Sequence, residues 1–285
     1  MQKLNKNQIT QILKEFNPTN QNKISGGKSK SIFKTNNKKA FMMEFIPSLR
    51  SITYNRKENI QGTELERLKA LVRIYSHLET KGIETNLLYN KVLKLNVNNQ
   101  ERHFIVVKDV KPIPIEWISR FYAAGSIVRL FPSIVTKGQK FSPPLQKYDL
   151  KQDLSVAGVD DPTLNENYMV GLNLITKEEL EYSKNLLSTI SNEVNEFLDE
   201  AGLTLIDLKM EFGYNEQNQI ILIDEITQDG TRINNNLGES VTKDTFRQGK
   251  TKEQVLQSYI DFNNAIGATN QLIDTIKQAG ENNGS

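Results

Sequence analysis

Hydrophobic residues follow two different spacings along this chain of 285 residues, and each spacing predicts a kind of element. Where they recur every three or four residues, the pattern predicts helices. These helices are expected over residues 7–16, 64–80, 177–201, 251–266 and 269–279. Thr176 and Glu179 precede the third helix at the spacing of a capping box, and Gly202 is placed to end it.

Alternating apolar and polar residues predict strands in other stretches. This pattern is found in residues 25–46, 88–96, 102–110, 113–121 and 203–232. The last of these is expected to fold as a hairpin about a polar turn at residues 215–218. Hairpins that come first, followed by helices with a further sheet, indicate an α+β fold. We expect two lobes, residues 1–110 and 111–285.

The amino-acid composition excludes several kinds of chemistry but says little about binding partners. The hydrophobic content of 37% is enough for a sizeable core, and a net charge of +2 gives no electrostatic reason to expect nucleic acid or a membrane as partner. The absence of cysteine excludes disulfides, thiolate zinc sites and cysteine nucleophiles, and it is compatible with a cytoplasmic location. The two histidines, His77 and His103, are expected to be structural. We find no signal-peptide core and no run of about 18 apolar residues.

The hairpin expected over residues 203–232 gathers carboxylates. In an extended strand Asp207, Lys209 and Glu211 share one face, and Asp224 follows at the end of the second strand. Clustered carboxylates repel one another unless a cation lies among them. Mg²⁺ is usually held by one or two carboxylates together with substrate phosphates, so this segment is a candidate metal site. The alternative is a solvated sheet face that ends in a turn.

A turn rich in glycine and lysine, GGKSKS at residues 26–31, is a second candidate. It is not a Walker A loop, because the earlier glycine is missing and a strand follows in place of a helix. A glycine-rich turn between strands can still lie over phosphates, with Lys28 and Lys30 supplying charge. Lys108 follows a strand of β-branched residues, where it either pairs with phosphates or is an edge lysine that reaches solvent.

Two arginines are candidates for binding anionic groups. Glu116 and Arg120 share one face of a strand, and the small residues 123–126 that follow allow a backbone to approach a ligand closely. Arg120 can then bind a carboxylate or phosphate with its planar fork, or it forms a plain ion pair with Glu116. Arg232 comes just after the turn at residues 229–230, where it either binds substrate or neutralises the carboxylates beside it.

Taken in order, these motifs resemble the SAICAR synthetase family from about Gly26 to Tyr259. The most specific are Arg-x-x-Ala-Ala-Gly-Ser at 120–126, Asp-x-Lys-x-Glu-Phe-Gly at 207–213 and Asp-Glu-Ile-x-x-Asp-x-x-Arg at 224–232. The resemblance implies a two-lobed α+β fold with a kinase-like or ATP-grasp-like nucleotide lobe. It also implies joining of aspartate to the carboxylate of carboxyaminoimidazole ribotide (CAIR), with ATP and Mg²⁺, through an acyl phosphate in purine biosynthesis.

The resemblance also implies a role for each matching residue. ATP would contact Gly27, Lys28, Lys30, Lys108 and Glu116. Metal would be held by Glu211 and Asp224, with Asp207 nearby. The substrates would be bound by Arg120, Ser126, Lys151, Asp161 and Arg232. Lys209 would neutralise charge at the reacting centre, together with Arg120 and Arg232.

Parts of the chain depart from the family pattern. No aspartate lies between Phe45 and Gly62, where the family has an aspartate-containing segment, and Arg50, Arg56 and Lys57 stand there instead. The large aromatic residue that the family places after the arginine turn is also absent. The sequence therefore leaves open a relative that joins a different amine or carboxylate, or a non-catalytic nucleotide-binding regulator. Assembly into a homo-oligomer is left open too.

Overall fold

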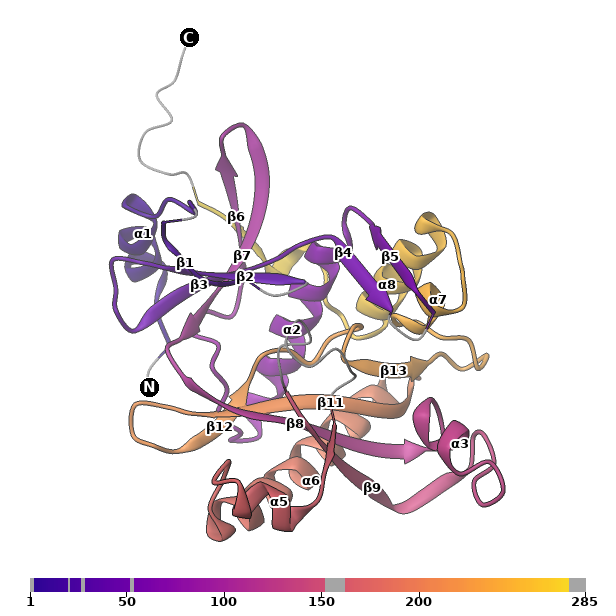
Figure 1. Cartoon of the computed structure of the whole chain (residues 1–285). Coiled ribbons are helices and arrows are strands. Elements are labelled where there is room, and N and C mark those ends of the chain that lie inside the picture. Colours follow the sequence, from indigo (N-terminus) through magenta and orange to yellow (C-terminus); the bar gives the residue numbers. More distant parts are fainter. Residues whose placement is uncertain (1–2, 20, 27–28, 52–53, 152–161, 277–285) are drawn as a thin grey trace. The chain divides into compact units, whose positions relative to one another are not determined.

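The computed structural model describes residues 3–19, 21–26, 29–51, 54–151 and 162–276 (Figure 1). The fold is α+β, as predicted, and the chain forms two compact units. Unit 1 comprises residues 1–77, 86–109 and 245–285, and unit 2 comprises residues 78–85 and 110–244. The predicted division at residue 110 differs from this in the segments 78–85 and 245–285, because the chain passes between the units more than once.

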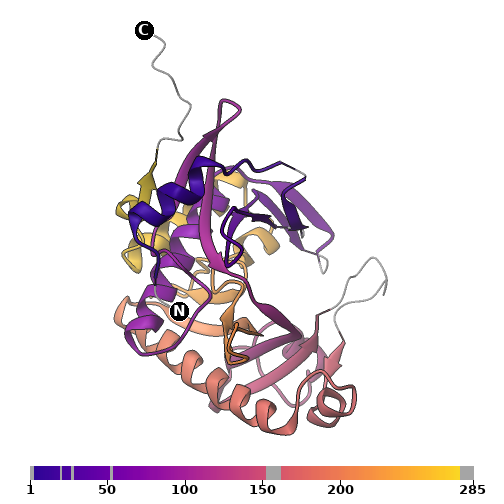
Figure 2. The ribbon, with the colours of Figure 1, turned by 90° about the vertical axis from the view of Figure 1, so that its left-hand side faces the viewer.

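Unit 1 is built on a six-stranded sheet in the order β1-β2-β3-β7-β6-β14. Its strands are β1 (Lys23–Gly26), β2 (Lys30–Lys34), β3 (Ala40–Phe45), β6 (Val92–Val97), β7 (Gln100–Lys108) and β14 (Ile273–Thr275). Neighbouring strands are antiparallel except β14, which runs parallel to β6. The β6–β7 hairpin extends beyond the other strands of this sheet (Figure 2).

Helix α1 (Lys6–Lys14) confirms the amphipathic helix predicted at the N-terminus. Ile9 and Ile12 are buried in one hydrophobic cluster with residues of the unit 1 sheet. Phe16, just beyond the helix, meets the rings of Phe33 and Phe104 edge-on at centroid distances of 6.3 and 5.4 Å. The apolar stripe of the sequence therefore fixes this helix to the sheet.

Outside this sheet and α1, the described part of unit 1 contains further helices and a separate hairpin. These elements are β4 (Ser48–Ser51), β5 (Arg56–Asn59), α2 (Thr63–Thr80), α7 (Asp244–Arg247) and α8 (Lys252–Ala265). The hairpin and the last two helices share a small apolar core that includes Leu49, Phe246 and Tyr259. Helix α2 begins in unit 1 and its last turn lies in unit 2.

Arg56, in the segment that departs from the family pattern, has a packing role. Its guanidinium lies 4.2 Å from the centre of the Phe246 ring and donates to the carbonyl oxygens of Phe246 and Lys250 at 2.6 and 3.0 Å. Its Nε also pairs with Glu58 at 2.6 Å. The charge of Arg56 is thus used to hold the β4–β5 hairpin to the C-terminal helices of unit 1.

The helix predicted over residues 269–279 is wrong. A single 3-10 turn, η1 (Asn270–Leu272), leads directly into strand β14, and residues 277–279 lie outside the described part of the chain. The β-branched Ile273 and Thr275 add a parallel edge strand beside β6. Pairing with a strand distant in sequence therefore overrode the local helical spacing of apolar residues.

Unit 2 contains a second antiparallel sheet, in the order β10-β9-β8-β11-β12, with β13 also paired to β11. Its strands are β8 (Lys111–Tyr122), β9 (Lys140–Leu150), β10 (Thr163–Leu164), β11 (Thr204–Tyr214), β12 (Ile220–Ile223) and β13 (Thr231–Asn234). Among its described residues, the helices are α3 (Ser126–Leu130), α5 (Glu166–Gly171) and α6 (Lys177–Glu200).

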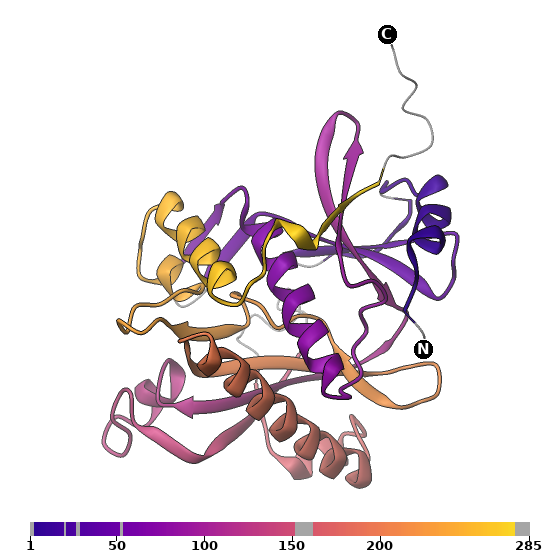
Figure 3. The ribbon, with the colours of Figure 1, turned by 180° about the vertical axis from the view of Figure 1, so that it is seen from behind.

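Helix α6 lies along one face of this sheet (Figure 3). It has the predicted capping box, in which the Thr176 side chain accepts from the Glu179 amide and the Glu179 side chain accepts from the Thr176 amide. Gln146 on β9 donates to the α6 residue Ser188 at 2.9 Å, and the ring of Trp117 on β8 is fully buried. The side chain of Gln146 therefore lies on the α6 side of the sheet, and the side chains one position away along the same strand point to the opposite face. No helix in the described residues is long and apolar enough to cross a membrane.

Candidate active site

Six of the predicted site residues lie on the face of the unit 2 sheet that is opposite α6. Directly paired residues of antiparallel strands share a face, so the strand register aligns these side chains in rows. We call the set the charged grid. The rows are given in the strand order β9, β8, β11 and, where it takes part, β13. The arginine row is Leu145, Arg120, Asp207 and Arg232. The lysine row is Lys147, Ile118 and Lys209, and the carboxylate row is Asp149, Glu116 and Glu211.

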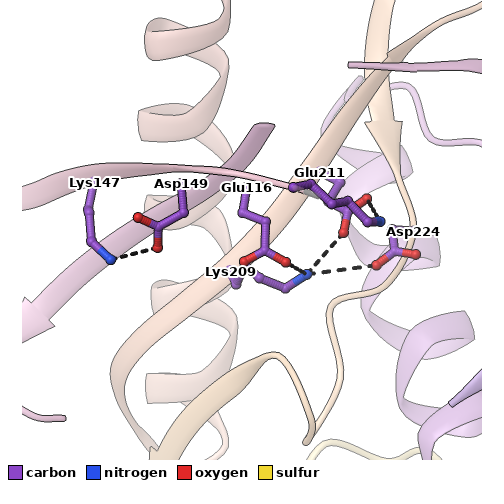
Figure 4. A network of polar contacts seen from close by, with 7 residues as sticks. Glu116, Lys147, Asp149, Lys209, Glu211 and Asp224 are labelled. Atoms are coloured by element: carbon purple, nitrogen blue, oxygen red, sulfur yellow. Dashed lines mark hydrogen bonds and ion pairs between the residues drawn. The ribbon is translucent and has the colours of Figure 1, made fainter. Parts of the chain in front are cut away.

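The carboxylate row is held together by lysines from the neighbouring positions (Figure 4). Carboxylates directly opposite one another on paired strands destabilise a sheet unless cations compensate them. Lys209 Nζ lies 3.0 Å from Oε1 of both Glu116 and Glu211. Lys151 Nζ lies 2.5 Å from the other oxygen of Glu211. The solvated-face alternative is therefore wrong for Glu211, which is buried and paired on both oxygens.

Asp224 joins this cluster from the end of β12. Its Oδ2 lies 4.0 Å from Lys209 Nζ, so one ammonium group faces three carboxylates. The backbone of Asp224 has a φ of 69°, in the left-handed region that residues other than glycine seldom adopt. Such strained positions are concentrated at functional sites, where the surrounding structure maintains them. Here the strained backbone directs the carboxylate toward Lys209.

The charge of Lys209 is fixed by its surroundings. Burial alone would lower the pKa of the Lys209 ammonium, but the nearby carboxylates of Glu211, Glu116 and Asp224 outweigh this and raise the pKa well above its usual value. Lys209 therefore stays protonated at neutral pH. It can neutralise negative charge but cannot act as a base there.

Glu211 and Asp224 are suited to a Mg²⁺ ion that arrives with a nucleotide. The described residues contain no group of three or more acidic or histidine side chains placed to enclose a metal by themselves. Two hard carboxylates are, however, what Mg²⁺ takes from a protein when phosphates supply further ligands. Asp207 was predicted near this pair, but its carboxylate is engaged by two arginines of a different row.

The charged residues of the arginine row form a second ion-pair network, in which Arg120 and Asp207 are buried and Arg232 and its second partner Asp244 are partly buried. Asp207 Oδ2 lies 2.7 Å from Arg232 Nη1 and 3.4 Å from Arg120 Nε, and Asp244 Oδ2 lies 3.2 Å from Arg232 Nε. Burial and the charge of Arg232 lower the pKa of Arg120, against the opposing effect of Asp207. Burial alone would lower the pKa of Arg232, but the charges of Asp207 and Asp244 outweigh this effect and raise that pKa. Asp207 and Asp244 balance the charges of the two arginines, and the planar guanidinium groups side by side still offer donors to an anion.

Gly125 fits closely against Arg232. A Cβ atom at this position would lie 2.8 Å from Arg232 Nη2, and the φ of 64° is also one that favours glycine. The small residues 123–126 were predicted to let the backbone approach a ligand, and in the structure this backbone approaches Arg232. The predicted substrate residue Ser126 begins helix α3 directly after this contact.

Two of the residues predicted to contact ATP, Lys30 and Lys108, lie in the described part of unit 1. Lys108 ends the interior strand β7 and is only 7% exposed, which rules out the alternative of an edge lysine reaching solvent. Lys30 begins β2, and its Nζ lies 5.6 Å from the centre of the Phe45 ring. The other predicted residues Gly27, Lys28 and Asp161 lie outside the described part of the chain.

Three residues of these networks were missed by the sequence reasoning. Lys147 and Asp149 on β9 stand opposite Ile118 and Glu116, and Asp244 is the second carboxylate on Arg232. Lysine and aspartate two residues apart on a predicted strand are a weak signal. Only the pairing of β9 with β8 shows that they continue the rows of the charged grid.

Comparison with known proteins identifies the class of this fold and site. A sequence model of the SAICAR synthetase family matches residues 23–261. The phosphoribosylaminoimidazole-succinocarboxamide synthase of Methanobrevibacter smithii is 32% identical over 252 residues, which cover 88% of this chain and 97% of that protein. The enzyme of the same name from Methanoculleus marisnigri is 34% identical over 235 residues, which cover 82% of this chain and 90% of that one.

Solved structures agree with this assignment. The crystal structure of phosphoribosylaminoimidazole-succinocarboxamide synthase from Ehrlichia chaffeensis matches with a TM-score of 0.75 at 27% identity, over 87% of this chain and 99% of that chain. A SAICAR synthetase in complex with ADP has the same fold, with a TM-score of 0.73 at 23% identity over 86% of this chain and 97% of its own. The chain therefore belongs to the SAICAR synthetase family.

Proposed function

We propose that this chain is an ATP-dependent ligase that joins aspartate to the carboxylate of CAIR, in the purine pathway of the cytoplasm. The observation that carries the proposal is the charged grid, in which an arginine row and a carboxylate row flank a lysine row on one sheet face. Such an arrangement suits a reaction that gathers phosphates and carboxylates. Phosphoryl transfer depends mainly on positioning and charge neutralisation, so a chain with two histidines can perform it.

The reaction would proceed in two steps. A carboxylate oxygen of CAIR attacks the γ-phosphorus of ATP, the bond to ADP breaks, and an acyl phosphate forms. The neutral amine nitrogen of aspartate then attacks the acyl carbon, the bond to phosphate breaks, and the nitrogen loses one proton to solvent as the amide forms. Both steps bring several negative charges together, which is the main obstacle that the protein has to remove.

The rows of the grid divide this task. Arg120 and Arg232 would bind the anionic groups of CAIR with their planar guanidinium groups, which Asp207 holds in place. Lys209 would neutralise the carboxylate that is phosphorylated and then attacked. Two cations held by a shared carboxylate need little reorganisation when the substrate arrives, and this preorganisation is what makes such groups effective.

The remaining predicted residues would serve the nucleotide and the substrates. Glu211 and Asp224 would hold Mg²⁺, which would supply positive charge beside the phosphates of the nucleotide. For ATP we propose contacts with Gly27, Lys28, Lys30, Lys108 and Glu116. For the substrates we propose additional contacts with Ser126, Lys151 and Asp161. A solved relative in complex with ADP supports nucleotide binding by this fold.

The test of this function is the release of ADP by the purified protein with ATP, Mg²⁺, CAIR and one amine at a time. We expect release that requires both CAIR and aspartate, with formation of the succinocarboxamide product. Glutamate and asparagine serve as matched comparisons, because each differs from aspartate by one methylene or one charge. Turnover with another amine but not with aspartate would favour the diverged relative, and no turnover with any of them would contradict the proposal.

The metal assignment makes a separate prediction. Mg²⁺–ATP is expected to raise the melting temperature of the protein, because a ligand that binds only the folded state stabilises it. Asp224→Asn keeps the size of the side chain but removes one carboxylate, and we expect it to abolish most of that increase. Glu178→Gln on α6 is the control, since it removes one acidic residue from the first turn of a helix outside the grid. An undiminished increase in the Asp224→Asn variant would refute the role of Asp224.

A further inference from the structure

The lysine row contains a second ammonium group that the proposed reaction has not used. Lys147 and Lys209 are both directly opposite Ile118, one on each neighbouring strand. Strands are about 4.8 Å apart, so the two side chains start roughly 10 Å from each other across the sheet. Ile118 is half-buried between them. The middle of the charged grid is therefore a short apolar floor with a lysine at each side.

Lys147 is held in place and remains accessible. Its Nζ lies 2.6 Å from Asp149 Oδ2, and the Thr163 hydroxyl donates to the other oxygen of Asp149 at 2.9 Å. Asp149 is buried, whereas 31% of the Lys147 side chain is exposed. An ammonium group has three donors, and Asp149 takes one of them. Asp149 and Thr163 thus fix the direction of Lys147 and leave it able to bind another acceptor.

Lys209 marks the position of the reacting carboxylate in the proposed function. The amine that attacks this carboxylate must lie beside Lys209, so the rest of the amine substrate extends away from it. In the proposed function, CAIR occupies the arginine row on one side of Lys209, and the nucleotide occupies the carboxylate row on the other side. The direction across Ile118 leads to Lys147, and it crosses an apolar surface suited to a short carbon chain.

We propose that Lys147 is a specificity-determining residue that binds a carboxylate of the amine substrate. It selects a short acidic amino acid over its uncharged analogues. This inference rests on the proposed function and deepens it, because it assigns the recognition of the amine to a residue outside the motifs that identify the family. An amide in place of the carboxylate loses the charge-assisted hydrogen bond to Lys147, so asparagine binds poorly.

The experiment compares Lys147→Met with Lys147→Arg and with Lys140→Met. Methionine keeps the apolar stem without the charge, arginine restores the charge, and Lys140 is an exposed lysine at the far end of the same strand. We expect Lys147→Met to raise KM for aspartate about 10- to 100-fold, the effect of losing one charge-assisted hydrogen bond. Because this contact persists through the reaction, kcat and the KM values for ATP and CAIR should change little. Lys147→Arg should recover most of the loss, and Lys140→Met should behave as wild type.

A second measurement separates recognition from a structural effect. The ratio of kcat/KM for aspartate to that for asparagine should fall in Lys147→Met, because the variant no longer distinguishes a carboxylate from an amide. An unchanged KM for aspartate, or an equal rise in KM for aspartate and ATP, would overturn the inference while leaving the proposed ligase intact. If wild-type protein fails to use aspartate at all, the proposed function itself fails, and the inference fails with it. Should Lys147→Met not fold, as judged by its melting temperature, Lys147→Gln takes its place.

Discussion

Replacing Lys209 with methionine is expected to lower kcat/KM for ADP release about 10²- to 10³-fold, the usual cost of removing one preorganised charge-stabilising group. Lys209 faces Glu116, Glu211 and Asp224 at distances of 3.0 to 4.0 Å, so its charge lies at the centre of the proposed reaction site. Methionine retains most of the apolar stem, and the strand should keep its packing. The measurement is steady-state ADP release with CAIR and aspartate.

The same variant should bind Mg²⁺ alone more tightly than the wild-type protein does. Without the ammonium group, three carboxylates that face one another repel until another cation joins them. The increase in melting temperature with Mg²⁺ and no nucleotide should therefore be larger in Lys209→Met. Lys81→Met is the matched control, since Lys81 pairs with Glu193 at 3.1 Å outside the grid. Equal activity in Lys209→Met and the wild type would contradict a role for this lysine in the reaction.

The contribution of the Lys209 charge to the stability of the protein should not vary with pH near neutrality. The carboxylates raise the pKa of Lys209 above 10.5 in the folded protein. A group with a raised pKa contributes its stabilisation fully below its unfolded pKa and loses it as the pH rises through the folded pKa. The part of the stability difference between wild type and Lys209→Met that comes from the Lys209 charge should therefore be constant around pH 7 and shrink in strongly alkaline solution.

The sequence predicted which side chains share a face but not which ones meet. Alternation along a strand placed Asp207, Lys209 and Glu211 together, and the structure confirms that they lie on one face of β11. It could not show that β8 and β13 put arginines opposite Asp207 and that β8 puts a glutamate opposite Glu211. Strand register depends on residues that are far apart in the sequence. Local alternation therefore could not show that Asp207 lies in an arginine network whereas Glu211 lies among lysines.

The same reason explains the other differences. Helices with strong periodicity and a cap, such as α6, were predicted within about one residue of their observed ends because their signals are local. Strand β14 was predicted as helix because its partner β6 is far away in the chain. Lys147 was missed because its importance comes from a neighbouring strand. Local patterns thus identified the elements, whereas pairing between distant strands determined the composition of the site.

Asp207→Asn is expected to destabilise unit 2 by about 3–5 kcal/mol, the usual cost of breaking a buried ion pair on one side. Asp207 is 4% exposed and faces the guanidinium groups of Arg232 and Arg120, and Arg120 is itself only 7% exposed. Asparagine keeps the size but not the charge of aspartate. Arg232 retains Asp244, whereas Arg120 loses the partner nearest to it and remains beside a like charge. The measurement is the midpoint of thermal or urea unfolding.

Anions provide the sharpest check on this explanation. Two arginines without their shared carboxylate should bind sulfate or phosphate, so either ion should raise the melting temperature of Asp207→Asn more than that of the wild type. The matched control is Glu181→Gln, which removes an exposed carboxylate that pairs with Lys184 at 3.1 Å. An exposed pair of this kind contributes about 0.5 kcal/mol, so that variant should unfold nearly as the wild type does. If Asp207→Asn were as stable as Glu181→Gln and indifferent to both anions, the arginine row would not be a buried charge network, and its proposed role in holding CAIR would lose its physical basis.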